Sequence, residues 1–173
     1  MWEVDADLWW RDLETHLRGA FLCARSVLPS MISHRQGRII TMGSRAGLQP
    51  VAYWSTYAIA KSALMRFTEN LAIETIDHNI SVFTLNPGVV RTAMAEYVLV
   101  AGEAWTPWYR RYFDEGRDAP PEHIAELCVF LASGKGDALS GRFVSVSDNI
   151  TEMVQRAEEI KKNNLYTLRL HRL

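Results

Sequence analysis

Three short apolar runs, each separated from the next by a long helical stretch, set the limits on how this chain folds. The runs are expected to be strands and cover residues 37–42, 80–85 and 142–147. Because the stretches between them are long enough to cross back over a sheet, neighbouring strands are expected to pair in parallel through right-handed crossovers. The pattern therefore predicts an α/β fold, a partial, Rossmann-like, doubly wound parallel sheet of about three strands with flanking helices.

The stretches around these strands carry apolar residues at every third or fourth position, which is typical of amphipathic helices. They predict one long helix over residues 5–34, a second over 54–77, a third over 120–133 and a charged helix over 151–162. Pro29 lies inside the first helix and is expected to kink it or end it, because proline lacks the N–H that the helix needs.

The composition is that of an ordinary soluble globular protein, with 48% hydrophobic and 23% charged residues. The formal net charge is −1, so neither nucleic acid nor an anionic membrane is expected as a partner. No apolar run reaches the roughly 20 residues that span a bilayer, and the acidic N-terminus lacks the pattern of a signal peptide. Cys23 and Cys128 do not have metal-ligand spacing and are expected to be small buried hydrophobes, so we expect a cytoplasmic protein without a metal site.

The stretch from Ser44 to Lys61 directly follows the first strand and carries the strongest chemical signal. Tyr57 and Lys61 lie four residues apart, so they stack on one face of a helix. A phenol with a pKa near ~10 is a poor acid or base at neutral pH, but an ammonium one turn away favours the phenolate. Since ligands are handled at the carboxyl ends of parallel strands, we expect Tyr57 to exchange a proton with a substrate oxygen that Ser44 holds.

A second motif, Asn86-Pro87-Gly88, follows the second strand. The Pro-Gly pair predicts a sharp turn whose backbone a ligand can approach closely, and Thr92 is expected to cap the segment that follows. Taken singly, each motif is more often an ordinary helix pair or turn, but their order along the chain favours a functional interpretation.

The segment over residues 92–118 has a broken pattern and is rich in aromatic residues. Trp105, Trp108 and Tyr109 are candidates for the walls of a site for an apolar or aromatic substrate. An equally weighted alternative is that about half of these aromatic residues cover the core.

The combination of Ser44, the Y-x-x-x-K pair of Tyr57 and Lys61, and the P-G-x-x-x-T element over residues 87–92 resembles the short-chain dehydrogenase/reductase family. The resemblance implies an oxidoreductase that acts on CH–OH groups and transfers a hydride between the nicotinamide of NAD or NADP and a small alcohol or ketone. It also implies that Ser44, Tyr57 and Lys61 are the catalytic residues.

The same resemblance implies a set of cofactor-binding residues, in which the Val90 backbone and the Thr92 hydroxyl hold the nicotinamide amide. The full set comprises Tyr57, Lys61, Pro87, Gly88, Val90 and Thr92. His16, in the sequence H-L-R-G, stands where the family usually has the asparagine of a proton relay. Whether the imidazole replaces that asparagine stays open.

The resemblance covers about residues 5–150, roughly the second half of a family domain, because the motif T-G-x-x-x-G-x-G and the N-A-G turn do not occur in the sequence. Residues 1–149 are therefore expected to be the C-terminal half of a Rossmann-type domain, and 150–173 a C-terminal helix and tail. In the family, the helices that match 5–34 and 54–77 pair with a second subunit, which implies a homo-oligomer.

Two other functions stay open for the chain. One is a truncated, non-catalytic dimerisation module, and the other is an epimerase or dehydratase that uses the same three catalytic residues. We also expect the strand over residues 38–42 to present an unpaired apolar edge, which favours aggregation. Without a glycine-rich pyrophosphate turn, the chain by itself is expected to bind neither dinucleotide measurably.

Overall fold

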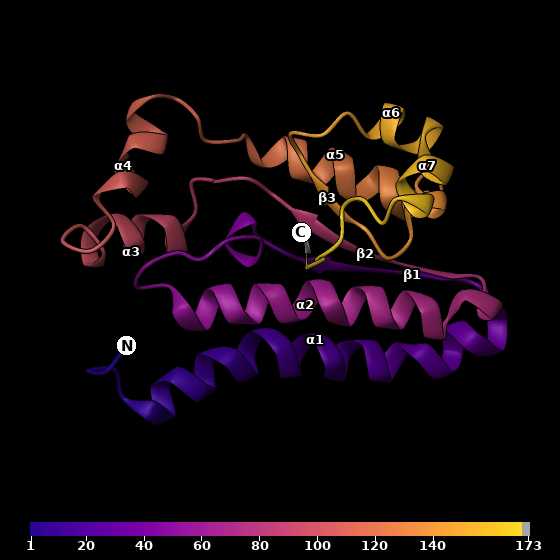
Figure 1. Cartoon of the computed structure of the whole chain (residues 1–173), viewed down its shortest axis with the longest axis horizontal. Helices are drawn as coiled ribbons and strands as arrows, with labels where there is room; N and C mark the ends of the chain where they lie inside the picture. Colours follow the sequence, from indigo (N-terminus) through magenta and orange to yellow (C-terminus); the bar gives the residue numbers. More distant parts are fainter. Residues whose placement is uncertain (171–173) are drawn as a thin grey trace.

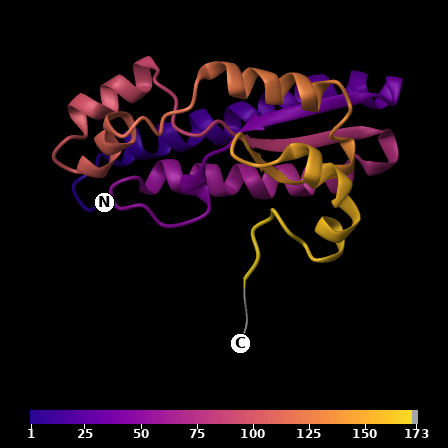
Figure 2. The same ribbon diagram turned by 90° about the horizontal axis from the view of Figure 1, so that it is seen from above.

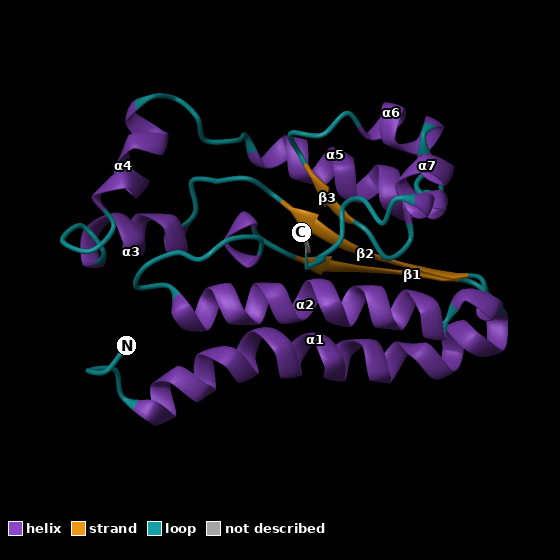
Figure 3. Ribbon diagram, viewed as in Figure 1, coloured by secondary structure: helices purple, strands orange, loops and turns teal. Residues whose placement is uncertain are grey.

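The computed structural model describes residues 1–170, which form a parallel sheet between two layers of helices (Figure 1). The sheet has the order β1-β2-β3, with both neighbouring pairs parallel, as the sequence predicts (Figure 3). The strands are β1 (Gly37–Met42), β2 (Ile80–Asn86) and β3 (Phe143–Ser145).

Strand β2 is buried along its whole length, as expected for the apolar central strand of a parallel sheet. Within residues 1–170, β1 pairs with β2 alone and is only partly buried, so it forms an edge of the sheet. Strand β3 is shorter than the predicted 142–147 because the backbone turns after it. The N–H of Ser145 donates to the Asp148 carboxylate at 2.8 Å, and the N–H of Asp148 donates to the Ser145 carbonyl at 2.9 Å.

Helices α1 (Ala6–His34) and α2 (Ser55–Glu74) lie side by side over one face of the sheet (Figure 1). Of the two outcomes expected at Pro29, a kink or an end of the helix, the end is excluded because α1 continues beyond it to His34. Its last turns still have core to cover, since Met31 packs against the apolar cluster between these helices and the sheet. The buried members of that cluster are Ala24, Leu71, Ala72, Ile80 and Val82.

Helix α2 ends earlier than the predicted residue 77. A 3₁₀ turn, η2 (Ile76–His78), follows it, and Asn79 then adopts the left-handed conformation with φ of 56°, as expected of a cap. A second short turn, η3 (Asp137–Leu139), is tied to β1 because Asp137 accepts two hydrogen bonds from Arg38, at 2.8 and 2.6 Å.

The opposite face of the sheet is covered by α5 (Pro121–Ala132) and two short helices, α6 (Ile150–Gln155) and α7 (Ala157–Lys162). The sequence predicts one helix over 151–162, but the backbone leaves the helical conformation at Arg156. This break lets both short helices contribute to the largest apolar cluster. Its buried members are Phe83, Leu85, Leu127, Leu131, Leu139, Val144, Met153, Ala157 and Ile160.

Helices α3 (Ala93–Ala101) and α4 (Pro107–Asp114) lie together at one end of the molecule, far from α6 and α7 at the other end (Figure 2). The arrows of β1 and β2 point toward this end (Figure 3). The two helices therefore stand beside the carboxyl ends of the strands, where the sequence analysis places the site.

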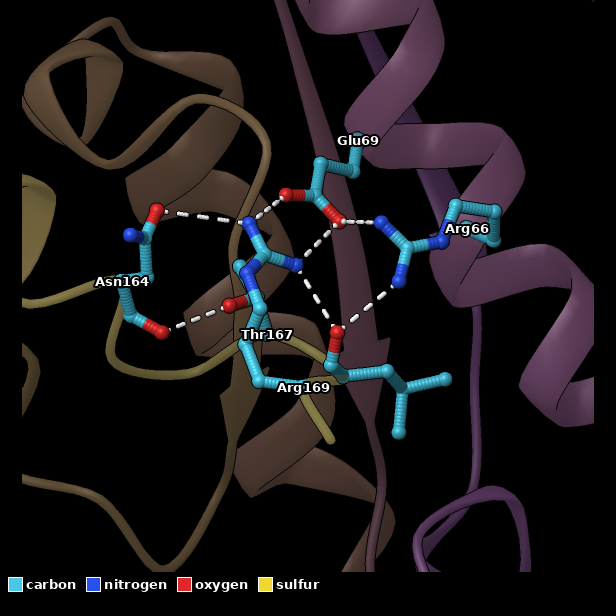
Figure 4. A network of polar contacts seen from close by, with 6 residues as sticks. Arg66, Glu69, Asn164, Thr167 and Arg169 are labelled. Atoms are coloured by element: carbon cyan, nitrogen blue, oxygen red, sulfur yellow. Dashed lines mark hydrogen bonds and ion pairs between the residues drawn. The ribbon is translucent and has the colours of Figure 1, made fainter. Parts of the chain in front are cut away.

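The tail after α7 returns to the sheet. The N–H of Phe143 donates to the Tyr166 carbonyl at 2.9 Å, and Arg169 pairs with Glu69 on α2 (Figure 4). The sequence leaves the tail open between strand and coil. It is irregular up to residue 170, and residues 171–173 lie outside the described part.

The structure bears on two features that the sequence analysis considered, the burial of the cysteines and the presence of membrane-spanning segments. Cys128 is half-buried, but Cys23 is exposed, because it lies on the side of α1 that faces the open edge of β1. Among residues 1–170, none of the helices is both long enough and apolar enough to cross a membrane.

Candidate active site

The candidate site begins at the carboxyl end of β1, where the chain enters a 3₁₀ turn, η1 (Arg45–Gly47). Ser44 caps this turn, its hydroxyl accepting from the N–H of Ala46 at 3.2 Å. The turn rests directly on α2, since the hydroxyl of Ser62 donates to the Gly47 carbonyl at 2.7 Å. This contact fixes the position of Ser44 relative to α2, the helix that carries Tyr57 and Lys61.

Gly47 makes this contact possible because it has no side chain. A Cβ at this position would lie 2.8 Å from the carbonyl carbon of Lys61 and 2.8 Å from the amide nitrogen of Ser62. Both are backbone atoms of α2, so neither can rotate away as the end of a side chain would.

We expect Gly47→Ala to lower the free energy of unfolding by about 1–3 kcal/mol, the usual cost of overpacking. Chemical denaturation of the variant and the parent measures the difference. Gly19→Ala is the matched control, because nothing lies within 4 Å of its added Cβ and its φ is not positive, so no loss of stability is expected there. A Gly47→Ala variant as stable as the parent would contradict the close packing of η1 on α2.

Tyr57 and Lys61 lie in the first turns of α2 and are brought together as predicted. The ammonium of Lys61 is 5.3 Å from the centroid of the Tyr57 ring and donates to the Met42 carbonyl at 2.8 Å. Lys61 is 6% exposed, so its charge is held inside the protein between the end of β1 and the phenol ring.

Burial dominates the electrostatics of the pair. The pKa of Tyr57 is raised, first by burial, while hydrogen bonding from Ser44 opposes the rise and the charge of Asp12 adds to it. Burial also lowers the pKa of Lys61, and Asp12 opposes that change. The net pKa of the phenol is therefore raised, and the lowering expected from Lys61 stays a prediction. Tyr57 is a protonated acid at neutral pH.

His16, from α1, also contacts the Tyr57 ring. The two ring centroids are 5.5 Å apart with an interplanar angle of 79°. Nε2 of His16 lies 3.8 Å from Oδ1 of Asp12, one helical turn earlier. The pKa of His16 is lowered, first by burial and then by the charge of Lys61, while Asp12 raises it. Sequence reasoning missed Asp12, although its spacing of four residues from His16 is a readable signal.

The Pro87-Gly88 turn follows β2 at the same edge of the sheet. Gly88 has a φ of 74°, in the left-handed region, and an added Cβ would lie 3.4 Å from Cγ2 of Val146. Val90 is partly buried, and Thr92 caps α3 as predicted, its hydroxyl accepting from the N–H of Ala95 at 3.3 Å.

An aromatic group lines the space between α2 and the α3–α4 pair. Trp54 sits at its centre, with its ring centroid 5.7 Å from Tyr57, 5.3 Å from Trp108 and 5.7 Å from Tyr109. Tyr109 is buried in a small core cluster, whereas Trp105 and Trp108 are 57% and 39% exposed. Of the three candidate wall residues, Trp105 and Trp108 are exposed to solvent, and Tyr109 covers the core. Trp54 was missed because its place beside α4 follows from contacts far apart in the sequence.

The arrangement places one proton donor, one hydroxyl and one buried ammonium at the carboxyl edge of a parallel sheet, beside an exposed aromatic surface. Among residues 1–170, His, Cys, Asp and Glu side chains form no group of three or more that could hold a metal ion. The fold is thus an α/β fold whose candidate site lies at the carboxyl ends of its parallel strands, the edge at which such folds usually bind ligands.

The family follows from comparison with known proteins. The family model described as short chain dehydrogenase matches residues 1–100, and the chain belongs to that family. It is 33% identical to the short chain dehydrogenase andI of Emericella variicolor, over 90% of this chain and 50% of that protein. It is also 33% identical to galactitol 2-dehydrogenase of Rhizobium johnstonii, over 86% of this chain and 58% of that protein.

A solved relative gives the same result for the fold. The crystal structure of a variant of actinorhodin polyketide ketoreductase with NADPH superposes with a TM-score of 0.74 at 28% identity, and the match covers 83% of this chain and 59% of that one. The chain spans about half the length of the curated relatives that it matches.

Proposed function

We propose that these residues form the catalytic part of an NAD- or NADP-dependent oxidoreductase that interconverts an alcohol and a ketone. The observation that carries the proposal is the position of Tyr57, whose protonated phenol lies between Ser44 and the buried Lys61 at the carboxyl edge of the sheet. In the reduction direction Tyr57 donates a proton to the substrate oxygen, Ser44 orients that oxygen, and Lys61 stabilises the phenolate that remains.

The residues around this edge fit the nicotinamide end of a dinucleotide. Gly88 keeps its turn free of a side chain, and Val90 and Thr92 follow it on the path toward α3. The proposed cofactor-binding set therefore consists of two groups of residues. Tyr57 and Lys61 come from α2, and Pro87, Gly88, Val90 and Thr92 come from the segment after β2. The nicotinamide, when bound, supplies or accepts the hydride, and the proton chemistry belongs to the side chains of this chain.

The substrate that we propose is a small alcohol or carbonyl compound with an apolar or aromatic body. Support comes from Trp108, whose exposed surface stands next to Trp54, the neighbour of Tyr57, and from the exposed Trp105, which contacts Tyr53. Flat rings stack favourably on such surfaces.

The proposal is tested by following the oxidation state of the cofactor. We expect a protein that carries these residues with a dinucleotide-binding segment to release one oxidised cofactor for each ketone reduced, measured by loss of nicotinamide absorbance. Conversion of substrate without net change of the cofactor would instead establish the epimerase or dehydratase alternative and reject the oxidoreductase.

A second candidate function, pairing with another copy of this chain, is favoured by the outer surface of α1 and α2. Large apolar side chains stay exposed there, among them Phe21, Leu22, Ile59 and Ile73. Exposed apolar surface of this kind marks contact sites. We expect size-exclusion chromatography at micromolar concentration to give at least a dimer, and a monomer would reject pairing.

A further inference from the structure

The tail after α7 is held on the body of the protein although its backbone is strained. Asn164 and Tyr166 have φ values of 51° and 58°, in the left-handed region. Asparagine tolerates this region, but a bulky residue such as tyrosine seldom adopts it. Backbone of this kind persists only where the surrounding contacts hold it. The Tyr166 carbonyl accepts the N–H of Phe143 at 2.9 Å, so the docked tail covers that donor on β3.

The contacts that hold the tail converge on Glu69 of α2 (Figure 4). Oε2 of Glu69 accepts from Nη1 of Arg66 at 2.6 Å and from Nη1 of Arg169 at 3.0 Å, and Oε1 accepts from Nη2 of Arg169. Both arginines also donate to the Leu168 carbonyl at 2.8 Å. The two guanidinium groups therefore have acceptors, and Arg169 ties the tail to the helix.

A third guanidinium, that of Arg142 just before β3, lies near the same carboxylate without a share in it. A Cβ on the preceding Gly141 would lie 3.9 Å from Cα of Glu69. Burial is the largest cause of the lowered pKa of Arg142, and the charge of Glu69 opposes that lowering while the charge of Arg169 adds to it. Among residues 1–170, Nε of Arg142 is the one buried side-chain nitrogen or oxygen without a hydrogen-bond partner. Such a group is unfavourable and calls for an acceptor.

Glu69 can supply that acceptor, but not to all three arginines at once. A carboxylate has about four acceptor positions, and three of those of Glu69 are filled by Arg66 and Arg169. An anion from solvent does not reach Nε of Arg142, because that atom is buried. Departure of Arg169 would free two positions on Glu69 beside Arg142.

We propose that Arg142 and Arg169 compete for Glu69, which makes the tail a releasable strap over β3. In the docked state Glu69 pairs with Arg169, and Nε of Arg142 has no partner. When the tail leaves, Glu69 pairs with Arg142 instead, and the N–H of Phe143 is uncovered. Release thus exchanges one ion pair for another and relaxes the strained backbone of the tail. The strap is a property of the fold that goes beyond the proposed function.

The test follows hydrogen exchange of the Phe143 amide by nuclear magnetic resonance of the ¹⁵N-labelled full chain, and it needs neither cofactor nor substrate. This N–H exchanges when the tail releases it or when the whole protein unfolds, and the amides of the buried strand β2 report the second route. We expect Arg142→Met, which keeps the length of the side chain but has no donor, to slow the exchange by about tenfold. The docked state then no longer buries an unpartnered donor, whose loss has an effect of this size or larger. If Arg142→Met does not fold, Arg142→Leu replaces it.

Matched variants separate competition from a general effect of arginine. Arg169→Met is expected to speed the exchange, because the tail loses its pair with Glu69. With Arg169 gone, Arg142 has no competitor, so adding Arg142→Met to Arg169→Met is expected to leave the exchange unchanged within about twofold. Arg18→Met, at an exposed pair on α1, is the control and is expected to leave the exchange of Phe143 as in the parent.

Faster exchange in Arg142→Met would show that Arg142 holds the tail in place, and unchanged exchange would show that it does not act on the tail. Either result would overturn the competition, as would an equal slowing by Arg142→Met when Arg169 is absent. Inorganic phosphate that slows the exchange in the parent, at matched ionic strength, but not in Arg142→Met would also overturn it, because Arg142 would then be an anion site. All of these results leave the proposed function of Tyr57 intact, because that depends on the oxidation of the cofactor.

Discussion

Replacement of Tyr57 by phenylalanine is expected to lower kcat by about a thousandfold, within the range that a positioned general acid contributes. The phenol is the proposed proton donor at the carboxyl edge, and burial raises its pKa, which favours the protonated form. Phenylalanine keeps the edge-on contacts with His16 and Trp54, so the ring packing survives while the proton is lost. Steady-state kinetics of a protein that carries these residues with a dinucleotide-binding segment measures the effect.

The matched control is Tyr53→Phe. Tyr53 lies four residues earlier and is 67% exposed, so the loss of its hydroxyl is expected to leave kcat within about twofold of the parent. A cofactor titration followed by nicotinamide fluorescence should show that Tyr57→Phe leaves cofactor binding largely intact, because the other residues of the proposed cofactor-binding set remain. An unchanged kcat in Tyr57→Phe would remove Tyr57 from the mechanism.

The parts of the site that the sequence predicts are those set by local spacing. Tyr57 and Lys61 share a helix face because they lie four residues apart, and Ser44 is placed by the end of the strand before it. Thr92 caps the helix that follows the Pro-Gly turn for the same local reason. Each of these placements follows from neighbours along the chain, while the packing of η1 on α2 then brings Ser44 to Tyr57 and Lys61.

The parts that the sequence does not predict depend on tertiary packing. Trp54 has its place because α4 folds back onto the start of α2, and the raised pKa of Tyr57 follows from burial that spacing alone does not show. The break at Arg156 likewise follows from the core, which receives side chains from both α6 and α7.

The fold, like the site, was predictable where local sequence determines it and less predictable where tertiary packing does. The order and direction of the strands were predictable, because long helical connections leave parallel pairing as the simple solution. The residues at which helices and strands end were less predictable. Helix α1 runs through Pro29 because the turns beyond it still cover core, and β3 stops at Ser145 because Asp148 draws the backbone into a turn.

Glu69 is the polar residue that joins α2 to the tail, and its loss is expected to lower stability. It is 7% exposed, and its carboxylate pairs with Arg66 from its own helix and with Arg169 from the tail, 100 residues away (Figure 4). Arg66 also donates to the Leu168 carbonyl at 2.8 Å, so the same group fixes the backbone of the tail. One buried carboxylate therefore joins α2 to the end of the described chain.

We expect Glu69→Ala to lower the free energy of unfolding by about 2 kcal/mol. Removal of one partner of a buried pair costs more than this, but Arg66 and Arg169 are partly exposed, and solvent screens the charges left behind. Arg169→Ala should cost about 1 kcal/mol or less, because Glu69 then keeps Arg66. The exposed pair of Glu14 and Arg18 provides the control, with Glu14→Ala expected to cost about 0.5 kcal/mol or less.

The stabilisation by Glu69 should also depend on pH. Its pKa is lowered in the folded protein, first by the hydrogen bond from Arg169 and then by the charges of the arginines, against the opposing effect of burial. A carboxyl group that binds its proton more weakly when folded stabilises the protein above its unfolded pKa, and the stabilisation is lost as the pH falls through its folded pKa. Denaturation of the parent and of Glu69→Gln across the acidic range should therefore give a difference that is constant near neutral pH and shrinks as Glu69 is protonated. A difference that does not change with pH would show that the Glu69 carboxylate does not hold the tail on α2 by its charge.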